Sequence, residues 1–353
     1  MKIILYTYDI MKIGGIETSF YNLSRYLSDK GHEVSVRYSK ADPMRIKRYK
    51  DAGIDVGLAK KEICDVLIVG SIWKQPNLIT CKVLAQQAHA DWSDDFWGGA
   101  IQAVGMIKKQ EPMTDLYLPV SSSSASFVKE HTNKPVIVMN NLAPEPTKIK
   151  KLKNKLPVIA AFTRMTTEKG LNNYEALRDR LKEIGFEAEL RVYTTGETPN
   201  GWNDREPVED IRTELEGVDF VASLADTESF GYTIAEANSC GIPCIIKKAN
   251  STLEFFDDSS NIILDKVSDL TKDMLTKKYD FKYTLREDTE KNIDGVIATL
   301  EQLITRKCII KSMRTFKDLE AKTTRAYGEV FSVSLERAEE LLSNEIKLVE
   351  RVS

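Results

Sequence analysis

The amino-acid sequence predicts an α/β protein of two domains, each built around a parallel β-sheet. Three observations predict this fold class. The chain has 353 residues, its N-terminal region follows the order strand, glycine turn, helix and strand, and a second series of strand patterns begins after residue 157. Domains commonly contain roughly 100–200 residues, so this length suits two domains that each bury a core of their own.

The first domain begins with a βαβ unit. Residues 2–7 form an apolar, β-prone run, Gly14 and Gly15 interrupt it, and apolar side chains over 16–27 recur at the spacing of one helix face. A strand pattern resumes at 32–36, and two parallel strands joined by a helix make a βαβ unit. Further buried strands are predicted at residues 66–69, 83–85, 116–118 and 136–138.

The composition changes at a lysine-rich segment, residues 148–156, which we interpret as a linker between a first domain (1–147) and a second (157–306). Second-domain strands are predicted at 158–162, 190–193, 220–222 and 244–246, with a helix at 171–184. Residues 307–353 are expected to form a C-terminal helical tail. The reason is an amphipathic stripe that contains Phe331, Leu335, Ala338, Leu342, Ile346 and Val349.

Charge and hydropathy exclude several classes of protein. Lysine plus arginine total 50 and aspartate plus glutamate total 53, and the resulting net charge of −3 argues against binding nucleic acid by bulk charge. The longest stretch without a charged residue, 116–128, is too short to span a bilayer. The chain begins without the pattern of a signal peptide, and its five cysteines form no CxxC pair. We therefore expect a cytoplasmic protein with reduced thiols.

The most informative motif contains two glutamates, Glu228 and Glu236, just after the predicted strand at 220–222. A glycine turn at Gly231 separates them, so the first lies on a loop and the second in the first turns of a helix. N–H groups at such a helix start can hold a phosphate, and the second carboxylate can accept hydrogen bonds from vicinal hydroxyls. Two glutamates at this spacing also occur on protein surfaces that bind nothing.

Three further features follow predicted strands. Arg164 and Lys169 come after the strand at 158–162, where a guanidinium and an ammonium group can converge on a diphosphate. Gly14 and Gly15 form the turn of the first βαβ unit, which any such unit needs. His89 follows the strand at 83–85, and a histidine in that place serves either in structural hydrogen bonding or at a functional site.

Together these motifs resemble the donor-site signature of retaining glycosyltransferases of the GT-B fold, in the group known as family four. The resemblance covers roughly residues 1–265 and implies two Rossmann-like domains facing a central cleft. It implies that Glu228 contacts the donor sugar, that Arg164 and Lys169 neutralise the leaving diphosphate, and that His89 faces the donor. These four are the catalytic residues that it implies. The donor-binding residues that it implies are Gly14, Gly15, Glu236 (at the ribose), Ser229, Phe230 and Gly231.

The resemblance implies hexose transfer from a nucleotide sugar, with a UDP-sugar as the expected donor, to a hydroxyl of a glycan, lipid-linked or other acceptor. Surface polysaccharide or glycoconjugate assembly is the expected setting. No separate cofactor is expected, and no metal, because no acidic pair lies at a strand end. Two alternatives stay open: a non-catalytic nucleotide-sugar-binding subunit of a partner transferase, and a phage-type transferase acting on modified DNA bases.

A basic cluster in the first domain also has two interpretations. It is either a solvated helix face, or a surface for anionic lipid or another polyanionic acceptor, which would put the protein at the inner face of the membrane. The cluster consists of Lys40, Arg45, Lys47, Arg48 and Lys50.

Overall fold

The computed structural model describes residues 1–353 with the exception of 11–13, 71–77, 91–98, 345–346 and 353. The first domain contains a six-stranded parallel sheet in the order β3-β2-β1-β4-β5-β6. Its strands are β1 (Lys2–Ile10), β2 (Glu33–Ala41), β3 (Asp55–Leu58), β4 (Glu62–Val69), β5 (Ile79–Ala88) and β6 (Leu116–Pro119). Its helices are α1 (Gly15–Asp29), α2 (Pro43–Asp51), α3 (Gly99–Gln110) and α4 (Ser122–Lys129).

The second domain repeats this architecture with a six-stranded parallel sheet in the order β12-β11-β10-β7-β8-β9. Its strands are β7 (Val158–Phe162), β8 (Glu189–Tyr193), β9 (Asn203–Arg205), β10 (Phe220–Ser223), β11 (Cys244–Lys247) and β12 (Ile262–Leu264). Its helices are α5 (Leu171–Glu183), α6 (Tyr232–Ser239), α7 (Thr252–Phe255) and α8 (Lys272–Thr276), with 3-10 turns at Thr167–Lys169, Ile211–Gly217 and Val267–Asp269.

The central strands are apolar on both faces because helices cover both sides of each sheet. In β1, Ile3 and Leu5 face the core under α1, while Ile4 faces a second cluster on the other side of the sheet. Helix α1 turns Phe20 and Leu27 into that first core, as the spacing of its apolar residues predicts. Both Rossmann-like halves are therefore confirmed.

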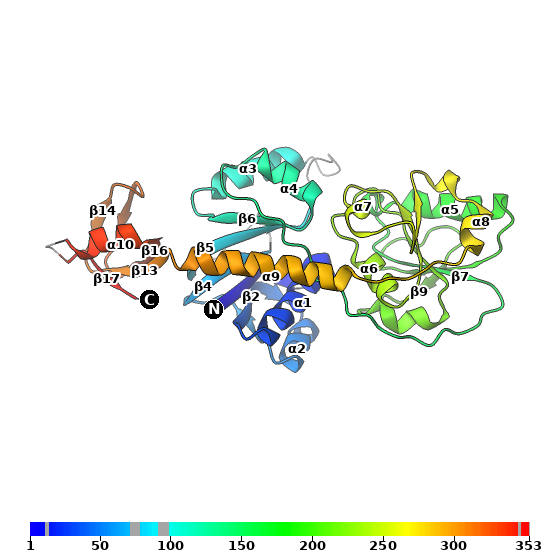
Figure 1. Ribbon diagram of the computed structural model, residues 1–353, viewed down its shortest axis with the longest axis horizontal. Coiled ribbons are helices and arrows are strands. Elements are labelled where there is room, and N and C mark those ends of the chain that lie inside the picture. The colour runs from blue at the N-terminus through cyan, green and yellow to red at the C-terminus, as the bar shows by residue number, and fades with distance from the viewer. Residues whose placement is uncertain (11–13, 71–77, 91–98, 345–346, 353) are drawn as a thin grey trace.

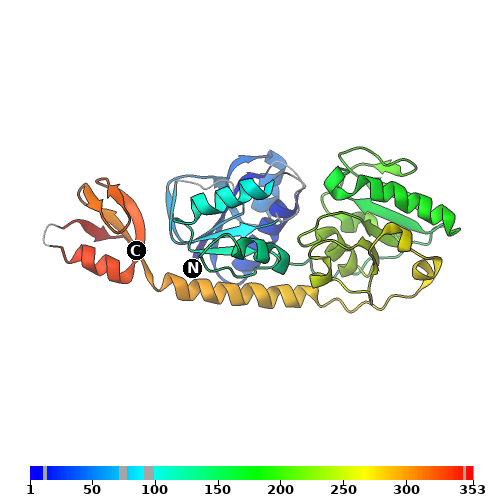
Figure 2. The same ribbon diagram turned by 90° about the horizontal axis from the view of Figure 1, so that it is seen from above.

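Helix α9 (Leu285–Ile304) follows the second domain in sequence but packs on the first (Figures 1 and 2). Ile293, Val296 and Leu300 are buried in the core of the first domain. Asp294 adds polar contacts, since it accepts a hydrogen bond from the Tyr26 hydroxyl at 2.8 Å and pairs with Lys30 at 2.9 Å. The chain thus returns to its first domain before it continues to the C-terminus.

Residues beyond α9 form a separate small unit at one end of the molecule (Figure 1). It consists of the sheet β16-β13-β17, the hairpin β14-β15 and one helix. The elements are β13 (Lys307–Ser312), β14 (Phe316–Asp318), β15 (Thr323–Arg325), β16 (Val330–Ser334), α10 (Leu335–Leu342) and β17 (Val349–Arg351).

The C-terminal region includes helices α9 and α10, but the apolar stripe does not form one continuous helix. Phe331 lies in β16 and Val349 in β17, and both pack with Ala338 of α10 in one core. The reason is that Ser334 caps the start of α10 and ends the strand before it. Ile346 of the predicted stripe lies outside the described residues.

The strand predicted at 136–138 is also different in the structure. Val136 forms only an isolated parallel bridge with Tyr117 of β6. The main-chain hydrogen bonds to β6 are few: the Pro135 carbonyl accepts from the Tyr117 N–H at 2.9 Å, and the Met139 N–H donates to the Pro119 carbonyl.

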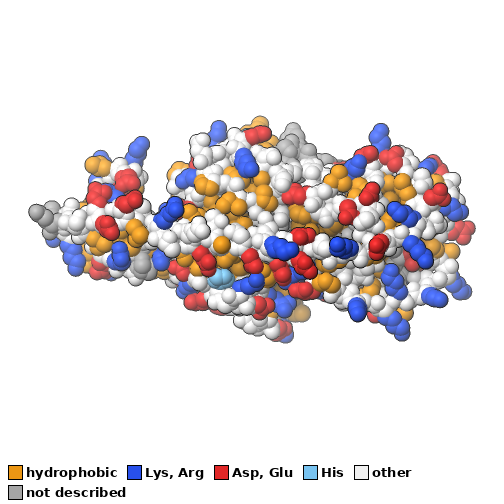
Figure 3. Space-filling model, viewed as in Figure 1, with side chains coloured by type: hydrophobic (Ala, Val, Ile, Leu, Met, Phe, Trp, Pro, Cys, Tyr) orange, Lys and Arg blue, Asp and Glu red, His pale blue; other side chains and the backbone are white. Residues whose placement is uncertain are grey.

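In the described part of the chain, no helix is both long and apolar enough to cross a membrane. The face in Figure 3 carries charged side chains of both signs, interspersed over all three parts of the molecule.

Candidate active site

The predicted site residues follow the carboxyl ends of parallel strands in both domains. Gly14 and Gly15 come after β1, His89 directly after β5, Arg164 after β7, and Glu228 after β10. The structure brings the two domains into contact here, because the Ser229 hydroxyl of the second domain donates a hydrogen bond to the main-chain carbonyl of His89 at 2.5 Å. Carboxyl ends of parallel strands are the usual place for ligands in such sheets.

Glu228 lies in a strongly electropositive environment. Its Oε1 accepts hydrogen bonds from the N–H groups of Ser229 at 3.1 Å, Phe230 at 3.4 Å and Gly231 at 3.1 Å, while Oε2 lies 3.3 Å from Lys169 Nζ. Burial alone would raise the pKa of this carboxyl group, but Lys169 and the backbone N–H groups outweigh burial, so its pKa lies below the usual value. Glu228 is therefore a stable carboxylate at neutral pH.

Glu236 lies in the opposite kind of environment, on the second turn of α6. Burial and the nearby carboxylate of Asp210 raise the pKa of Glu236 to about 7, against the opposing charges of Arg212 and Arg48. Among the described residues, none donates a hydrogen bond to its side chain; only its main-chain carbonyl is bonded, by Ser239. A half-buried carboxyl group without a hydrogen-bond donor is costly to ionise. A ligand that supplies hydroxyl donors can reduce this cost.

The loop between β7 and α5 holds both predicted cationic residues. The loop ends at Gly170, which has a φ of +77°. A Cβ added at this position would lie only 2.2 Å from Leu224 O, so only glycine fits there. This close approach sets Lys169 beside Glu228. Arg164 is exposed and, within the described ranges, forms no ion pair. The Thr166 hydroxyl is buried without a hydrogen-bond partner in that same part of the chain, as expected of a loop that accepts a ligand.

His89 is a neutral imidazole in this structure. Burial lowers its pKa to about 4, so the ring carries one proton at neutral pH. Its Nε2 lies 2.9 Å from the side-chain oxygen of Gln87, and an amide oxygen can only accept, so Nε2 holds that proton. The ring meets Phe20 edge-on, with centroids 6.5 Å apart. His89 can therefore offer Nδ1 as an acceptor, and it is not a cation.

Comparison with known proteins identifies the architecture. No family model and no curated protein matches the sequence, but solved structures do. HepE of Anabaena, in complex with UDP, matches with a TM-score of 0.60 at 15% identity, over 86% of this chain and 100% of that one. The lipopolysaccharide outer core galactosyltransferase WaaB matches with a TM-score of 0.58 at 14% identity, over 84% and 100%. TarM of S. aureus, in a complex that includes UDP, matches with a TM-score of 0.64 at 9% identity, over 86% and 100%.

The chain has the GT-B fold. In this GT-B chain the Ser229 and Phe230 side chains of the loop before α6 contact other parts of the protein. The polar groups of Ser229 bond to Glu228 and His89, and the Phe230 ring is buried against Tyr232 and Phe255, with centroids 5.0 and 4.9 Å away. Gly231 caps the helix with a φ of +84°. The Ser229 and Phe230 side chains thus hold the loop, and its backbone faces the Glu228 carboxylate.

One site residue was missed as a functional candidate although it belongs to the glycine turn. Glu17 follows Gly14 and Gly15 on the first turn of α1, and its carboxylate lies against Gly14, where an added Cβ would come within 2.5 Å of Oε2. Burial raises the pKa of Glu17, and the positive charges of Arg45 and Arg164 oppose that rise. Glu17 of the first GT-B domain therefore interacts with Arg164 of the second, and the acidic position in the turn was the available signal.

A second ion pair beside Lys169 and Glu228 was also missed. Lys247, at the end of β11, pairs with Asp226, which also accepts from Asn173 Nδ2 at 3.2 Å. Neither residue belongs to a recognisable motif, so only the adjacency of β10 and β11 reveals the pair. Among the described residues, no group of three histidine, cysteine or acidic side chains is arranged to hold a metal ion.

Proposed function

We propose that this chain is a retaining glycosyltransferase that transfers a hexose from a UDP-sugar to a hydroxyl group of a glycan or lipid-linked acceptor. The setting we infer is surface polysaccharide or glycoconjugate assembly at the cytoplasmic side of the membrane. Support comes from the GT-B fold, from the UDP bound to the similar HepE and TarM structures, and from WaaB, a lipopolysaccharide outer core galactosyltransferase.

The observation that carries this proposal is the Glu236 carboxyl group, half-buried beside Asp210 and lacking a hydrogen-bond donor in the described part of the chain. Vicinal ribose hydroxyls supply two such donors, which would stabilise the carboxylate. The position suits this role, because Glu236 lies on the helix that begins directly after the Glu228 loop. A nucleotide that extends from Glu236 toward Glu228 would have its sugar near the domain interface.

The remaining residues fit the parts of such a donor. The diphosphate would lie against Arg164 and Lys169, whose charges would stabilise the leaving group as the glycosidic bond breaks. Lys169 has three N–H donors, so it can keep its contact with Glu228 and still bind a phosphate oxygen. Glu228 would accept hydrogen bonds from the sugar. The acceptor hydroxyl would attack the anomeric carbon from the face on which the diphosphate leaves, the bond from that carbon to the diphosphate oxygen would break, and the hydroxyl proton would pass to the departing diphosphate.

The test is calorimetric binding of UDP to three proteins: the unchanged chain, Glu236→Ala and the matched control Glu216→Ala, an exposed glutamate of the second domain. Loss of a charge-assisted hydrogen bond should weaken UDP binding by about 10 to 150-fold in Glu236→Ala. The control should bind as the unchanged chain does. Unaltered UDP affinity in a folded Glu236→Ala protein would contradict the assignment.

Activity is tested with a panel of UDP-sugars and cell-extracted acceptors, in excess EDTA. We expect transfer to continue in the chelator, and NMR of the product should show the anomeric configuration of the donor. An inverted product, or activity that requires added magnesium, would contradict the retaining, metal-independent reaction.

The second candidate is a nucleotide-sugar-binding subunit without catalysis. One observation favours it, since both oxygens of Glu228 are already engaged by the loop and by Lys169. Hydrolysis of the donor by the isolated chain distinguishes the two functions. An enzyme releases UDP slowly from its donor even without an acceptor, and a binding subunit leaves the donor intact.

A further inference from the structure

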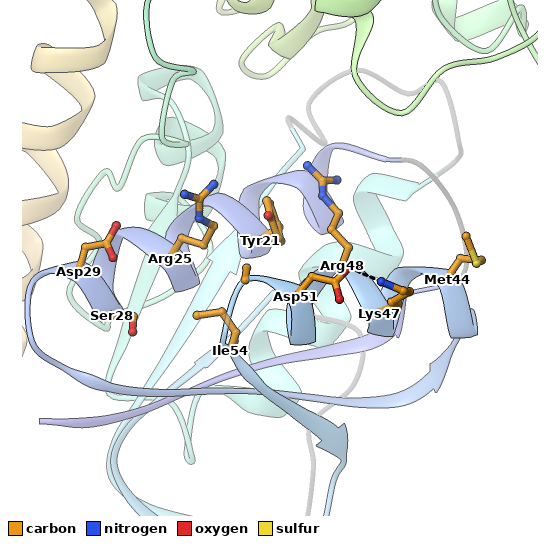
Figure 4. A pocket seen from close by; sticks show the side chains of 10 residues that line it. Tyr21, Arg25, Ser28, Asp29, Met44, Lys47, Arg48, Asp51 and Ile54 are labelled. Atoms are coloured by element: carbon orange, nitrogen blue, oxygen red, sulfur yellow. Dashed lines mark hydrogen bonds and ion pairs between the residues drawn. The ribbon is translucent and has the colours of Figure 1, made fainter.

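An open groove of about 690 Å³ lies between helices α1 and α2 of the first domain (Figure 4). Helix α1 contributes Tyr21 and Arg25, and helix α2 contributes Met44 and Arg48. The groove contains part of the basic cluster that the sequence left with two interpretations.

Two arginines share one aromatic ring in this groove. The guanidinium carbon of Arg48 lies 3.9 Å from the centroid of the Tyr21 ring, and that of Arg25 lies 5.8 Å from the same centroid. Both side chains extend to the same side of the two helices, one on either side of Tyr21 (Figure 4). A guanidinium group against an aromatic ring keeps its N–H edge available for other partners.

The aromatic platform is held from behind. Tyr49 of α2 is buried and meets the Tyr21 ring edge-on, with centroids 5.4 Å apart. Its hydroxyl donates to the main-chain carbonyl of Glu17 at 3.3 Å, which ties α2 to the first turn of α1. The ring that orients Arg48 is therefore supported by the core between the helices, which reduces the conformational entropy lost when a ligand binds.

Among the described residues, no carboxylate lies within ion-pair distance of the Arg25 or Arg48 guanidinium group. Two carboxylates line the same groove: Asp51 is paired with Lys47 at 2.6 Å, and Asp29 forms no ion pair in that part of the chain. The lining therefore keeps a net positive charge, which favours an anionic ligand. A phosphomonoester carries about −1.5 to −2 charges at neutral pH and has three acceptor oxygens, whereas a carboxylate carries only one charge.

The groove borders the interface between the two domains. Arg45, on the same helix as Arg48, forms a salt bridge with Glu209 of the second domain at 3.3 Å. Arg48 also interacts electrostatically with Asp210 and Glu236 of that domain. A phosphoryl group in the groove would thus lie next to the site that we assign to the donor.

We propose that the α1–α2 groove binds a phosphoryl group through Arg25 and Arg48 on the Tyr21 platform, and that this group belongs to the acceptor. The second half of the proposal rests on the proposed function, because only a transferase has an acceptor. Two sources supply this chemistry, the headgroup of a membrane phospholipid and the phosphate of a soluble phosphorylated acceptor.

The first experiment titrates glycerol 3-phosphate into the full chain saturated with UDP, so that phosphate sites of the donor are filled, and follows binding by phosphorus NMR. We compare the unchanged chain, the double variant R25Q/R48Q and the control R306Q/R314Q, which removes the same charge from two exposed arginines outside the groove. Binding should weaken by about tenfold or more in R25Q/R48Q and stay unchanged in the control. Equal binding in R25Q/R48Q and the unchanged chain, or equal losses in both variants, would overturn the proposal.

The second experiment separates the two sources by co-sedimentation with vesicles of phosphatidylcholine, with and without phosphatidylglycerol. A lipid headgroup as ligand predicts sedimentation only with phosphatidylglycerol, reduced in R25Q/R48Q. If the ligand is a soluble phosphorylated acceptor, the protein should bind glycerol 3-phosphate but should not sediment with either kind of vesicle. Sedimentation that is equal in all three proteins would overturn the headgroup as the source. A failure of the groove is distinguishable from a failure of the proposed function, because UDP binding tests the donor site separately.

Discussion

The two glutamates of the motif owe their opposite behaviour to local hydrogen bonding. Glu228 is surrounded by backbone N–H groups and Lys169, which together overcome the cost of burial, so its pKa falls. Glu236 is half-buried beside Asp210, and no described residue donates a hydrogen bond to its side chain, so its pKa rises to about 7. Pairs of carboxyl groups whose environments separate their pKa values are typical of sites where each group has its own role.

We predict that UDP binding depends on pH through Glu236. With a pKa of about 7, Glu236 is mostly protonated at pH 6, and a ligand that needs the carboxylate as acceptor must displace that proton. UDP affinity should therefore increase from pH 6 to pH 8 and then level off. Calorimetry across this range should show the increase in the unchanged chain and a flat profile in Glu236→Gln. The same slope in both proteins would assign the pH dependence to another group.

We also predict that Glu236→Gln stabilises the ligand-free protein at high pH. The pKa of Glu236 is raised on folding, so the stability that this group contributes is complete below its unfolded pKa and is lost as pH rises through about 7. Glutamine removes that loss, and at pH 8 the gain in unfolding free energy should be on the order of 1–2 kcal/mol. Urea unfolding of both proteins at pH 5 and pH 8 measures it. A gain of equal size at both pH values would contradict the mechanism.

At the scale of elements, the loop from β7 to α5 depends on one contact between main chains. Gly170 lies so close to the carbonyl of Leu224 that the turn ending at Lys169 is held against the end of β10. This brings residues 59 positions apart, Lys169 and Glu228, to a separation of 3.3 Å. The ion pair between them is thus a result of backbone packing and not its cause.

Gly170→Ala should therefore reduce both stability and UDP binding. A Cβ would approach Leu224 O to 2.2 Å at a φ of +77°, so the loop must move and carry Lys169 away from Glu228. We expect a loss of about 2 kcal/mol or more in unfolding free energy, with UDP affinity reduced in parallel. The control is Gly185→Ala, where φ is +63° but an added Cβ meets no atom within 4 Å. It should cost about 1 kcal/mol of backbone strain and leave UDP binding unchanged.

At the scale of the whole molecule, the two domains are joined by a few polar contacts and by α9. Glu254 of α7 accepts hydrogen bonds from the Ser122 N–H at 2.8 and 3.0 Å and from its hydroxyl at 3.1 Å, at the start of α4 in the first domain. Arg45 with Glu209, and Ser229 with His89, add two more contacts across the interface. Contacts of this kind are weak enough to exchange during a catalytic cycle.

Glu254→Gln should favour a more open arrangement of the domains. Replacing the carboxylate by an amide loses hydrogen-bond energy of about 1–2 kcal/mol, which shifts an open–closed equilibrium by roughly 5 to 30-fold. Small-angle scattering should show a larger radius of gyration for free Glu254→Gln, and UDP should compact both proteins. Glu216→Gln, at an exposed glutamate of the second domain, serves as the matched control. Identical scattering with and without UDP would contradict closure by the nucleotide.

Much of the fold, and the choice of candidate site residues, follows from local patterns in the sequence. The apolar runs at the cores of β1, β4, β7 and β11 are buried on both faces, and the spacing over 16–27 produces α1, because strand and helix periodicities are local properties. The candidate residues Arg164, Lys169, Glu228 and Glu236 are predicted from the same kind of local pattern. Each belongs to a short motif beside a strand end, and the parallel sheets place such ends together.

Other features depend on contacts between distant parts of the chain, which local patterns do not contain. The apolar face of α9 would suit either domain, and only packing with distant residues of the first domain assigns it there. The spacing of the stripe from Phe331 to Val349 predicts a helix, yet short apolar runs fit strands equally well, and pairing with β13 places Phe331 and Val349 in strands. The Asp226–Lys247 pair and the shared ring of Arg25 and Arg48 likewise arise when separate elements pack. The periodicity of the sequence thus determines most of the helices and strands. Where they pack is determined by the free energy of burying their apolar surfaces against residues that are distant in the sequence.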